Sequence, residues 1–270
     1  MNQGDDMESK NNKISVFVII LSILLILGIL LFVVFQFINI KNTNNDYSNI
    51  ASSYASDITK ESNTEITSPS IDEKLAENPI DFASIKKQND EIYSWIYIPN
   101  TNINYPVCQS KTNDNFYLDH DIYKNYSFPG AIYSQSCNKT DYSDRVTLLY
   151  GHNMIDGSMF ADLHKYSDAG FFNKNKYMYI YTENKKLTYE IASAFIYDDR
   201  HIMNSFNFSN DDEFQEYLDT VSNPRSVSKN VREGLSLTTN DKIVTLSTCL
   251  NSGQGRYLVQ WVLINDERTK

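Results

Sequence analysis

Cysteine is scarce in this sequence, and paired cysteine motifs are absent. The 270 residues include three cysteines, Cys108, Cys137 and Cys249, and none of them belongs to a CxxC motif. This absence excludes a zinc ribbon and a thioredoxin-like redox centre. Because three is an odd number, at least one thiol is free or pairs with another chain. The sequence leaves a disulfide between Cys108 and Cys137 open.

An excess of positive charge is also missing. The chain has 24 lysine and arginine residues against 34 aspartate and glutamate residues, a formal net charge of -10. Recognition of a phosphate backbone requires a basic surface, so we expect no nucleic-acid partner. No internal repeat occurs. A compact acidic loop of the EF-hand type is absent too, so the sequence indicates no metal site.

One long apolar run stands near the N-terminus, over residues 14–38: ISVFVIILSILLILGILLFVVFQFI. A helix of about 20 residues crosses the hydrocarbon core of a bilayer, which is ~30 Å thick. The apolar region of a cleaved signal peptide is shorter, roughly 7–15 residues, and a small-x-small cleavage site follows it. No such site follows this run. The sequence therefore predicts an uncleaved transmembrane signal anchor.

The segments on either side of this anchor differ in size and composition. Residues 1–13 are too few to fold, and two lysines before the run against one after it favour a cytoplasmic N-terminus. Residues 39–75 are rich in Asn, Ser, Thr, Asp and Glu, and such a segment buries too little apolar surface to fold. We expect a flexible polar stalk there, and a folded domain over residues 76–270 outside the membrane.

Short runs rich in Tyr, Ile, Val and Thr follow one another through the folded domain, separated by turn residues. Their alternation of apolar and polar residues is typical of β-strands. The runs cover residues 92–98, 103–107, 131–135, 146–150, 177–182, 187–197, 242–249 and 257–264. Eight short strands at this spacing predict a mostly β fold, a closed or nearly closed barrel.

Two helices are expected beside these strands. Residues 81–88 follow a proline and carry apolar side chains three positions apart, which predicts a short N-terminal helix. A second helix, over 211–221, follows Ser209 as its predicted N-cap. It places three apolar side chains on one face: Phe214, Leu218 and Val221.

Cys249 ends an apolar strand and precedes a polar loop. The two-residue period of a strand puts Thr245, Ser247 and Cys249 on one face, so a hydroxyl-bearing face ends in a thiol. A thiol at a strand end beside a loop has the exposure that a reactive cysteine needs. The alternative is a small buried hydrophobic residue, which is the role of most free cysteines.

A nucleophilic cysteine requires a base or an electrostatic partner. Of the four histidines, His152 is favoured by position, because it follows a strand directly, after Gly151. Arg256 begins the strand after Cys249, and a hairpin between the two strands would bring its guanidinium to the thiol. An arginine there can stabilise an oxyanion. Taken singly, a structural histidine and a surface arginine are the commoner cases.

Several motifs, taken together, resemble one family. TLSTC at 245–249 resembles the TLxTC signature of sortases, and Arg256 resembles their active-site arginine. YGHNMIDGSMFADL at 150–163 resembles the histidine segment of class B sortases, the cysteine transpeptidases of Gram-positive bacteria. The resemblance extends in order over residues 79–264, and it includes the short N-terminal helix and the helix late in the domain.

The resemblance implies an eight-stranded sortase-type β-barrel with an N-terminal helix and an extra helix late in the barrel. It implies that Cys249 attacks the Thr carbonyl of a C-terminal sorting motif and forms a thioacyl enzyme. His152 then acts as acid and base, and Arg256 stabilises the oxyanion. Ser247 and Thr248 flank the nucleophile and are candidate substrate contacts.

The same resemblance implies partners and a location. The partners are surface proteins with a C-terminal sorting signal and an amine acceptor, from a peptidoglycan precursor or another molecule. No cofactor is required. The enzyme would be a single-pass protein of the cell membrane, held by residues 14–38, with its catalytic domain extracellular.

Three alternatives remain at this point. A membrane-tethered cysteine protease that only hydrolyses its substrate would use the same three residues. A non-catalytic β-barrel binding module would need none of them. A sortase that polymerises pili is less favoured, because residues 41–75 lack the Asp-Pro-aromatic segment of a lid.

Overall fold

The computed structural model describes residues 3–55, 58, 75, 77–250 and 253–270. The chain divides into two compact units, Met1–Asn45 and Asp46–Lys270, and each is described by itself. Helix α1 (Gln3–Tyr54) contains most of the first unit and the first residues of the second.

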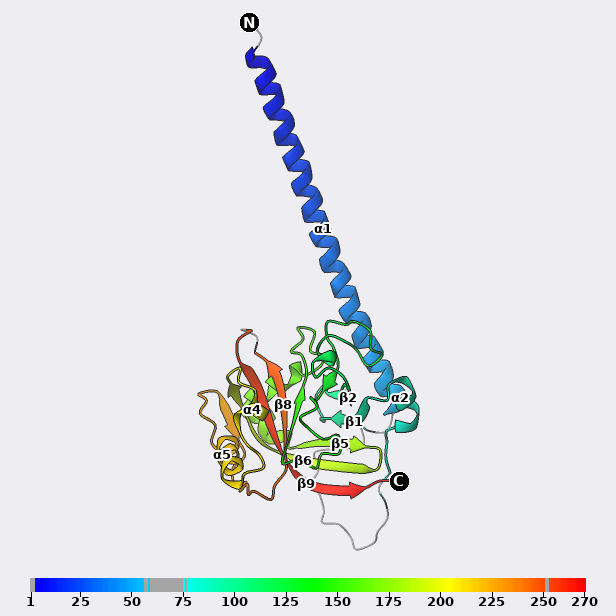
Figure 1. Cartoon of the computed structure of the whole chain (residues 1–270), viewed down its shortest axis with the longest axis vertical. Helices are drawn as coiled ribbons and strands as arrows, with labels where there is room; N and C mark the ends of the chain where they lie inside the picture. The colour runs from blue at the N-terminus through cyan, green and yellow to red at the C-terminus, as the bar shows by residue number, and fades with distance from the viewer. Residues whose placement is uncertain (1–2, 56–57, 59–74, 76, 251–252) are drawn as a thin grey trace. The chain divides into compact units, whose positions relative to one another are not determined.

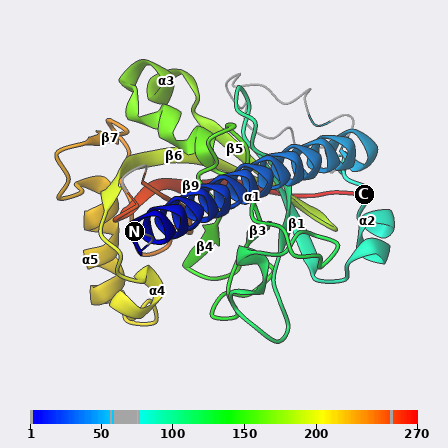
Figure 2. The ribbon, with the colours of Figure 1, turned by 90° about the horizontal axis from the view of Figure 1, so that it is seen from above.

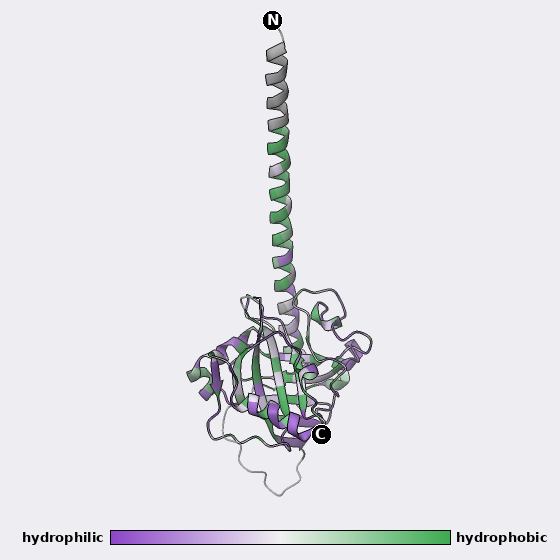
Figure 3. Cartoon of the chain, turned by 60° about the vertical axis from the view of Figure 1, so that its left-hand side comes forward, coloured by the Kyte–Doolittle hydropathy of each residue, from purple (hydrophilic) through white to green (hydrophobic). Residues whose placement is uncertain are grey.

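The first unit consists of helix with exposed apolar side chains. All side chains from 16 to 35 are exposed, and nearly all are large and apolar. This stretch of the helix is mostly green, the hydrophobic end of the scale, in Figure 3. By length and composition this helix is able to cross a membrane. The finding is compatible with the anchor predicted over residues 14–38.

The first part of the predicted stalk differs from the structure. Residues 39–54 continue α1, and Tyr47 and Ile50 are each only 4% exposed within the unit that begins at Asp46. Tyr47, Ile50 and Tyr54 are spaced as one face of a helix, and this spacing makes an otherwise polar segment amphipathic. The folded unit therefore begins before residue 76. Most of the remaining predicted stalk, including 59–74, lies outside the described residues.

The second unit is built on a β-barrel (Figure 1). Neighbouring strands follow the order β5-β1-β2-β3-β4-β8-β9-β6, and β6 pairs again with β5, which closes a barrel of eight strands. The short β7 adds to β6 outside this ring. The strands are β1 (Ile92–Tyr97), β2 (Asn104–Cys108), β3 (Ile132–Tyr133), β4 (Val146–Tyr150), β5 (Tyr177–Thr182), β6 (Lys185–Tyr197), β7 (Lys229–Val231), β8 (Ile243–Cys249) and β9 (Arg256–Arg268). The predicted mostly β, eight-stranded barrel is confirmed.

Helices lie against the outside of the barrel. Figure 2 shows α4 and α5 on one flank and α2 on the opposite flank. The helices of this unit are α2 (Phe82–Gln88), α3 (Ala169–Lys174), α4 (Ile202–Ser205) and α5 (Asp211–Ser222), with 3-10 turns η2 (Phe116–Leu118) and η3 (Ala161–Ser167). The predicted N-terminal helix and the late helix are thus both present, as α2 and α5.

Helix α5 packs its apolar face against the barrel. Phe214, Leu218 and Val221 are fully buried with Val146 of β4 and Ile243 of β8. Burial of a side chain of this size contributes about 1.5–3 kcal/mol, so three of them hold the helix firmly.

The predicted N-cap of α5 was wrong by one position. Asn210, not Ser209, caps the helix, and its Oδ1 accepts a hydrogen bond from the amide of Glu213 at 3.0 Å. Asparagine caps as well as serine does, so composition alone did not separate the two neighbours.

Candidate active site

Cys249 and Arg256 face each other across two hydrogen-bonded strands. β8 and β9 are antiparallel, and their register pairs Cys249 directly with Arg256. The guanidinium Nη1 of Arg256 donates to the Sγ of Cys249 at 2.7 Å. The contact joins a fixed positive charge to the sulfur atom at the end of β8. The predicted hairpin partnership of the two residues is present in the structure.

The tight connection between β8 and β9 requires an unusual backbone at Gly255. Its φ is +84°, and a Cβ built there would lie 2.9 Å from the Tyr197 carbonyl oxygen on β6. The Gly255 amide donates to Oδ1 of Asp199 at 3.1 Å. The same carboxylate oxygen lies 3.9 Å from Nε of Arg256. Asp199 therefore holds both the loop and the guanidinium, and sequence analysis did not identify it.

His152 lies at the same end of the barrel as Cys249. β4 and β8 are parallel, with Tyr150 opposite Ser247, and the Gly151 amide extends this ladder to the Ser247 carbonyl at 3.2 Å. His152 follows Gly151 directly, and Cys249 ends β8 two residues after Ser247. The parallel pairing thus explains why Tyr150 and Ser247, which are 97 residues apart in sequence, lie side by side at this end of the barrel.

The imidazole of His152 is held in a defined orientation. Its Nε2 lies 2.7 Å from the carbonyl oxygen of Leu118, and its ring stacks on Phe128 with centroids 5.7 Å apart. A carbonyl only accepts, so Nε2 carries the hydrogen in this contact. In the neutral ring, Nδ1 is then the nitrogen that can accept a hydrogen bond.

Two residues that the sequence did not point to hold the backbone carbonyl of Cys249. Asn153 Nδ2 donates to the Cys249 carbonyl at 3.1 Å, and His164 Nε2 donates to the same oxygen at 3.0 Å. The His164 ring also stacks on Tyr257, 4.9 Å between centroids. Asn153 directly follows His152, and this adjacency was the one signal for it. Nothing local in the sequence pointed from His164 to Cys249.

The two predicted substrate contacts lie differently. Ser247 shares the strand face of Cys249 and is 4% exposed, whereas Thr248 faces the opposite way and is 2% exposed. The hydroxyl of Thr248 is buried and has no hydrogen-bond partner among the described residues. Ser247 thus shares the face of β8 that carries Cys249, and Thr248 lies on the other face.

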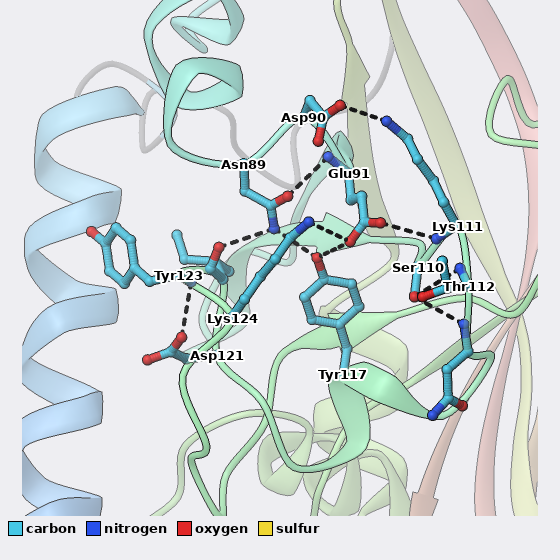
Figure 4. Close-up of polar contacts among 12 residues, drawn as sticks. Asn89, Asp90, Glu91, Ser110, Lys111, Thr112, Tyr117, Asp121, Tyr123 and Lys124 are labelled. Atoms are coloured by element: carbon cyan, nitrogen blue, oxygen red, sulfur yellow. Dashed lines mark hydrogen bonds and ion pairs between the residues drawn. The ribbon is translucent and has the colours of Figure 1, made fainter.

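The loop that supplies the Leu118 carbonyl is fixed by a polar cluster around Glu91 (Figure 4). The carboxylate of Glu91, itself at the start of the barrel, accepts from the Tyr117 hydroxyl at 2.6 Å and from the Lys111 amide at 3.0 Å. Lys124 Nζ lies 3.1 Å from it. Asn89 Nδ2 donates to the same Tyr117 hydroxyl at 2.7 Å. Three positions along the loop are therefore tied to one buried carboxylate.

The electrostatics of Glu91 agree with this role. Burial raises the pKa of the carboxyl, but hydrogen bonds from Tyr117 and the Lys111 amide and the charge of Lys124 outweigh burial. The net effect lowers the pKa of Glu91 below its ordinary value. The group is consequently an anion at neutral pH.

The other two cysteines take no part in this site. All three thiols are free, so the disulfide between Cys108 and Cys137 that the sequence left open is not formed. Cys108 is buried in β2, and burial raises the pKa of its thiol. Cys137 is exposed on a loop, and partial burial of its sulfur raises its pKa as well.

Comparison with known proteins identifies the family. Residues 96–263, more than half of the chain, match the sortase domain. Sortase B of Listeria monocytogenes is 33% identical over 189 residues, which is 67% of this chain and 72% of the relative. The crystal structure of Clostridium perfringens sortase B superposes with a TM-score of 0.62 at 35% identity, over 68% of this chain and 99% of that one.

A second solved structure covers more of the chain. Sortase B from B. anthracis, in complex with AAEK1, gives a TM-score of 0.67 at 29% identity, over 85% of this chain and 99% of that one. The sortase match includes the thiol, the imidazole and the guanidinium that converge at the end of β4, β8 and β9. The chain therefore belongs to the sortase family, in class B, whose members are cysteine transpeptidases.

Proposed function

We propose that this enzyme cleaves a C-terminal sorting motif after Thr and transfers the acyl group to an amine through a thioacyl intermediate on Cys249. The observation that carries the proposal is the 2.7 Å contact between Arg256 Nη1 and Cys249 Sγ, with His152 at the same end of the barrel. A thiol, a cation and an imidazole are the groups that acyl transfer by cysteine requires.

In the acylation step, the Cys249 thiolate attacks the carbonyl carbon of the Thr residue in the motif. Negative charge moves to the carbonyl oxygen, and the guanidinium of Arg256 stabilises it. The C–N bond then breaks as the leaving amine takes a proton from His152, and a thioester remains on Cys249. Nδ1 is the nitrogen that supplies this proton, because Nε2 is engaged by the Leu118 carbonyl. Nδ1 takes the proton from the Cys249 thiol before the attack, which leaves a thiolate beside an imidazolium.

In the transfer step, His152 accepts the proton from the incoming amine as this amine attacks the thioester. The C–S bond breaks, and the new amide leaves the thiolate of Cys249 beside Arg256. Asp199 and the side-chain donors of Asn153 and His164 keep the two reacting groups aligned. Of the two flanking residues, Ser247 is the one placed to border the bound motif.

The partners follow from this chemistry. We infer that the donors are surface proteins with a C-terminal sorting signal, and that the acceptor is the amine of a peptidoglycan precursor or of another surface molecule. Residues 14–38 would anchor the enzyme in the cell membrane as a single-pass protein, with the catalytic unit extracellular. An anchored enzyme meets anchored substrates by diffusion in the membrane plane.

An amine-exchange assay tests the transpeptidase step. Full-length protein in detergent is incubated with a library of Thr-containing sorting peptides, with and without an added amine. We expect a thioacyl adduct on Cys249 by mass spectrometry and an amide product that depends on the amine. Cys249→Ala should lower turnover by about 10⁴-fold or more and abolish the adduct. Hydrolysis that ignores added amine would instead favour a tethered cysteine protease.

A further inference from the structure

Tyr47 is a buried residue in the segment where the sequence predicts a solvated stalk. Its hydroxyl donates to the carbonyl oxygen of Gly130 at 2.8 Å. Its ring packs edge-on against Tyr105 of β2, with centroids 5.4 Å apart. Both contacts lie within the unit Asp46–Lys270, so this turn of α1 belongs to the folded catalytic unit.

The first contact leads to the imidazole through one loop. Gly130 closes the loop that begins after β2, and its φ is +59°. A Cβ built there would lie 2.5 Å from the Leu118 carbonyl oxygen, so the two backbones touch. The Leu118 oxygen is the acceptor for Nε2 of His152 at 2.7 Å. A shift of Gly130 would therefore displace the acceptor that orients the imidazole.

The second contact leads to the other side of His152. The Tyr105 hydroxyl accepts from the amide of Met159 at 3.0 Å. Met159 pairs with Asn153 as an isolated β-bridge, and the next amide, of Phe160, donates to the His152 carbonyl at 2.9 Å. Tyr105 thus supports the loop whose backbone carries the imidazole, and the Tyr47 ring packs on Tyr105.

The Glu91 cluster supports a different part of the same loop. It ties Lys111, Tyr117 and Lys124 together, whereas Tyr47 contacts Gly130, where the loop closes. The Glu91 cluster and Tyr47 thus support two different parts of the loop that carries the Leu118 carbonyl. All residues of the Glu91 cluster follow residue 76 in the chain. A truncation near residue 76 would therefore keep this cluster and remove Tyr47.

From these two converging routes we propose that Tyr47 is a positioning residue for His152. Its hydroxyl and ring hold the two loops on either side of the imidazole. The segment 46–54 is then part of the catalytic unit, and it keeps Nε2 of His152 on the Leu118 carbonyl and Nδ1 toward the thioester. The consequence for turnover rests on the proposed function, whereas the orientation of the ring does not.

Tyr47→Phe and Tyr47→Leu in the full-length chain test the two routes separately. Phe removes the hydroxyl and keeps the ring, and Leu removes both. We expect kcat for amine exchange to fall about 5-fold in Tyr47→Phe and about 20-fold or more in Tyr47→Leu, with KM within twofold of wild type. Displacement of the His152 imidazole, the proposed acid and base, slows the chemical step. The loss of activity is therefore expected in kcat and not in KM.

Tyr142→Phe is the matched control. Tyr142 is buried, and its hydroxyl lies 2.6 Å from Oγ of Ser94, away from both routes. Like Tyr47→Phe, it removes one buried, hydrogen-bonded hydroxyl and keeps the ring, so its cost in thermal stability is comparable. We expect kcat of this variant to equal that of wild type.

Nitrogen NMR of the histidine-labelled, detergent-solubilised chain reads the imidazole directly. The His152 signal is assigned by its loss in His152→Gln. We expect the Nε2–H tautomer in wild type and in Tyr142→Phe, and a mixture of tautomers in both Tyr47 variants. Equal kcat losses in Tyr47→Phe and Tyr142→Phe, or a wild-type tautomer in Tyr47→Leu, would overturn the proposal. If wild type failed to exchange amines, the transpeptidase proposal would be wrong. The tautomer of His152 in the Tyr47 variants would still test whether Tyr47 positions the imidazole.

Discussion

The two halves of the active site are held by different kinds of structure. Cys249 and Arg256 are directly opposite each other on the antiparallel strands β8 and β9. His152 lies just beyond β4, in a loop, and its ring is oriented by the carbonyl of Leu118 from a second loop. The thiol–guanidinium pair is thus set by strand register, and the imidazole by contacts between loops.

This difference has an energetic side. A register slip in β8 or β9 would turn a whole buried face outward, so the barrel core protects the Cys249–Arg256 pair. Loop positions depend on a few hydrogen bonds, each of which contributes about 0.5–1.5 kcal/mol. We therefore expect substitutions around His152 to change its geometry without unfolding the barrel. Substitutions in the strand half should lower activity either by removing a functional group or by straining the backbone.

The largest effect is expected in the strand half, from Arg256→Ala. Loss of the guanidinium removes the cation at the sulfur and at the developing oxyanion, so kcat/KM should fall by about 10²–10³-fold. Arg256→Lys keeps a point charge without the planar fork and should recover only part of this loss. Steady-state kinetics with a sorting peptide measure both. Full recovery in the lysine variant would show that charge alone suffices.

Gly255→Ala should strain the same half, and Gly253→Ala is its matched control. Both glycines have positive φ, but only a Cβ at Gly255 approaches another atom, the Tyr197 carbonyl oxygen at 2.9 Å. We expect Gly255→Ala to lose about 2–4 kcal/mol of unfolding free energy, with activity down about 10-fold as Arg256 shifts. Gly253→Ala should lose about 1–2 kcal/mol and stay active. Chemical denaturation and kinetics compare them, and equal losses would contradict the strain argument.

A smaller effect is expected where the two halves meet, at the Cys249 carbonyl. His164→Phe keeps a ring against Tyr257 and removes one of two donors to that oxygen, so kcat should fall about 5-fold. Asn153→Ala removes the other donor. The double variant should lose more than the product of the single losses, because the carbonyl then has no donor from either side chain. Simple additivity would mean that the two donors act independently.

The smallest effect on activity, but a distinct pH dependence of stability, is expected from Glu91→Gln in the loop half. The folded pKa of Glu91 lies below its ordinary value of 4.5, so its stabilisation is complete above that pH and is lost as pH falls through the folded pKa. At pH 7 the variant should be less stable by about 1–3 kcal/mol, with activity within about threefold of wild type. Denaturation at several pH values should show this difference shrinking below pH 4.5. A difference that stays constant into acid would contradict the assignment.

Sequence alone located much of the barrel and of its site. Alternation of apolar and polar residues placed the strands of the barrel, because a strand buries one face at a period that the sequence shows. The same period put Cys249 at a strand end, and the following strand began with Arg256. These are local patterns in the sequence. Because β8 and β9 are consecutive strands that pair with each other, residues close in sequence come into contact in the structure.

The missed features are contacts between distant segments. Tyr47 lies in a segment whose mean composition is polar, so composition suggested a stalk, although its apolar residues fall on one helical face. His164, in η3, reaches the Cys249 carbonyl, and Asp199, in the loop after β6, reaches Arg256, and both residues are far from their partners in sequence. No local spacing encodes such a meeting, since it depends on how the barrel closes.

The sequence by itself thus determined that the chain forms a β-barrel and carries an apolar run near its N-terminus. It also determined which thiol, imidazole and guanidinium lie at strand ends. Only the tertiary structure decided how these groups are oriented. The parallel pairing of β4 with β8 places His152 and Cys249 at the same end of the barrel, and the loop closed at Gly130 presents the Leu118 carbonyl to the imidazole. The physical reason is that burial patterns are periodic and local, whereas the orientation of a side chain in a loop depends on individual hydrogen bonds from remote parts of the chain.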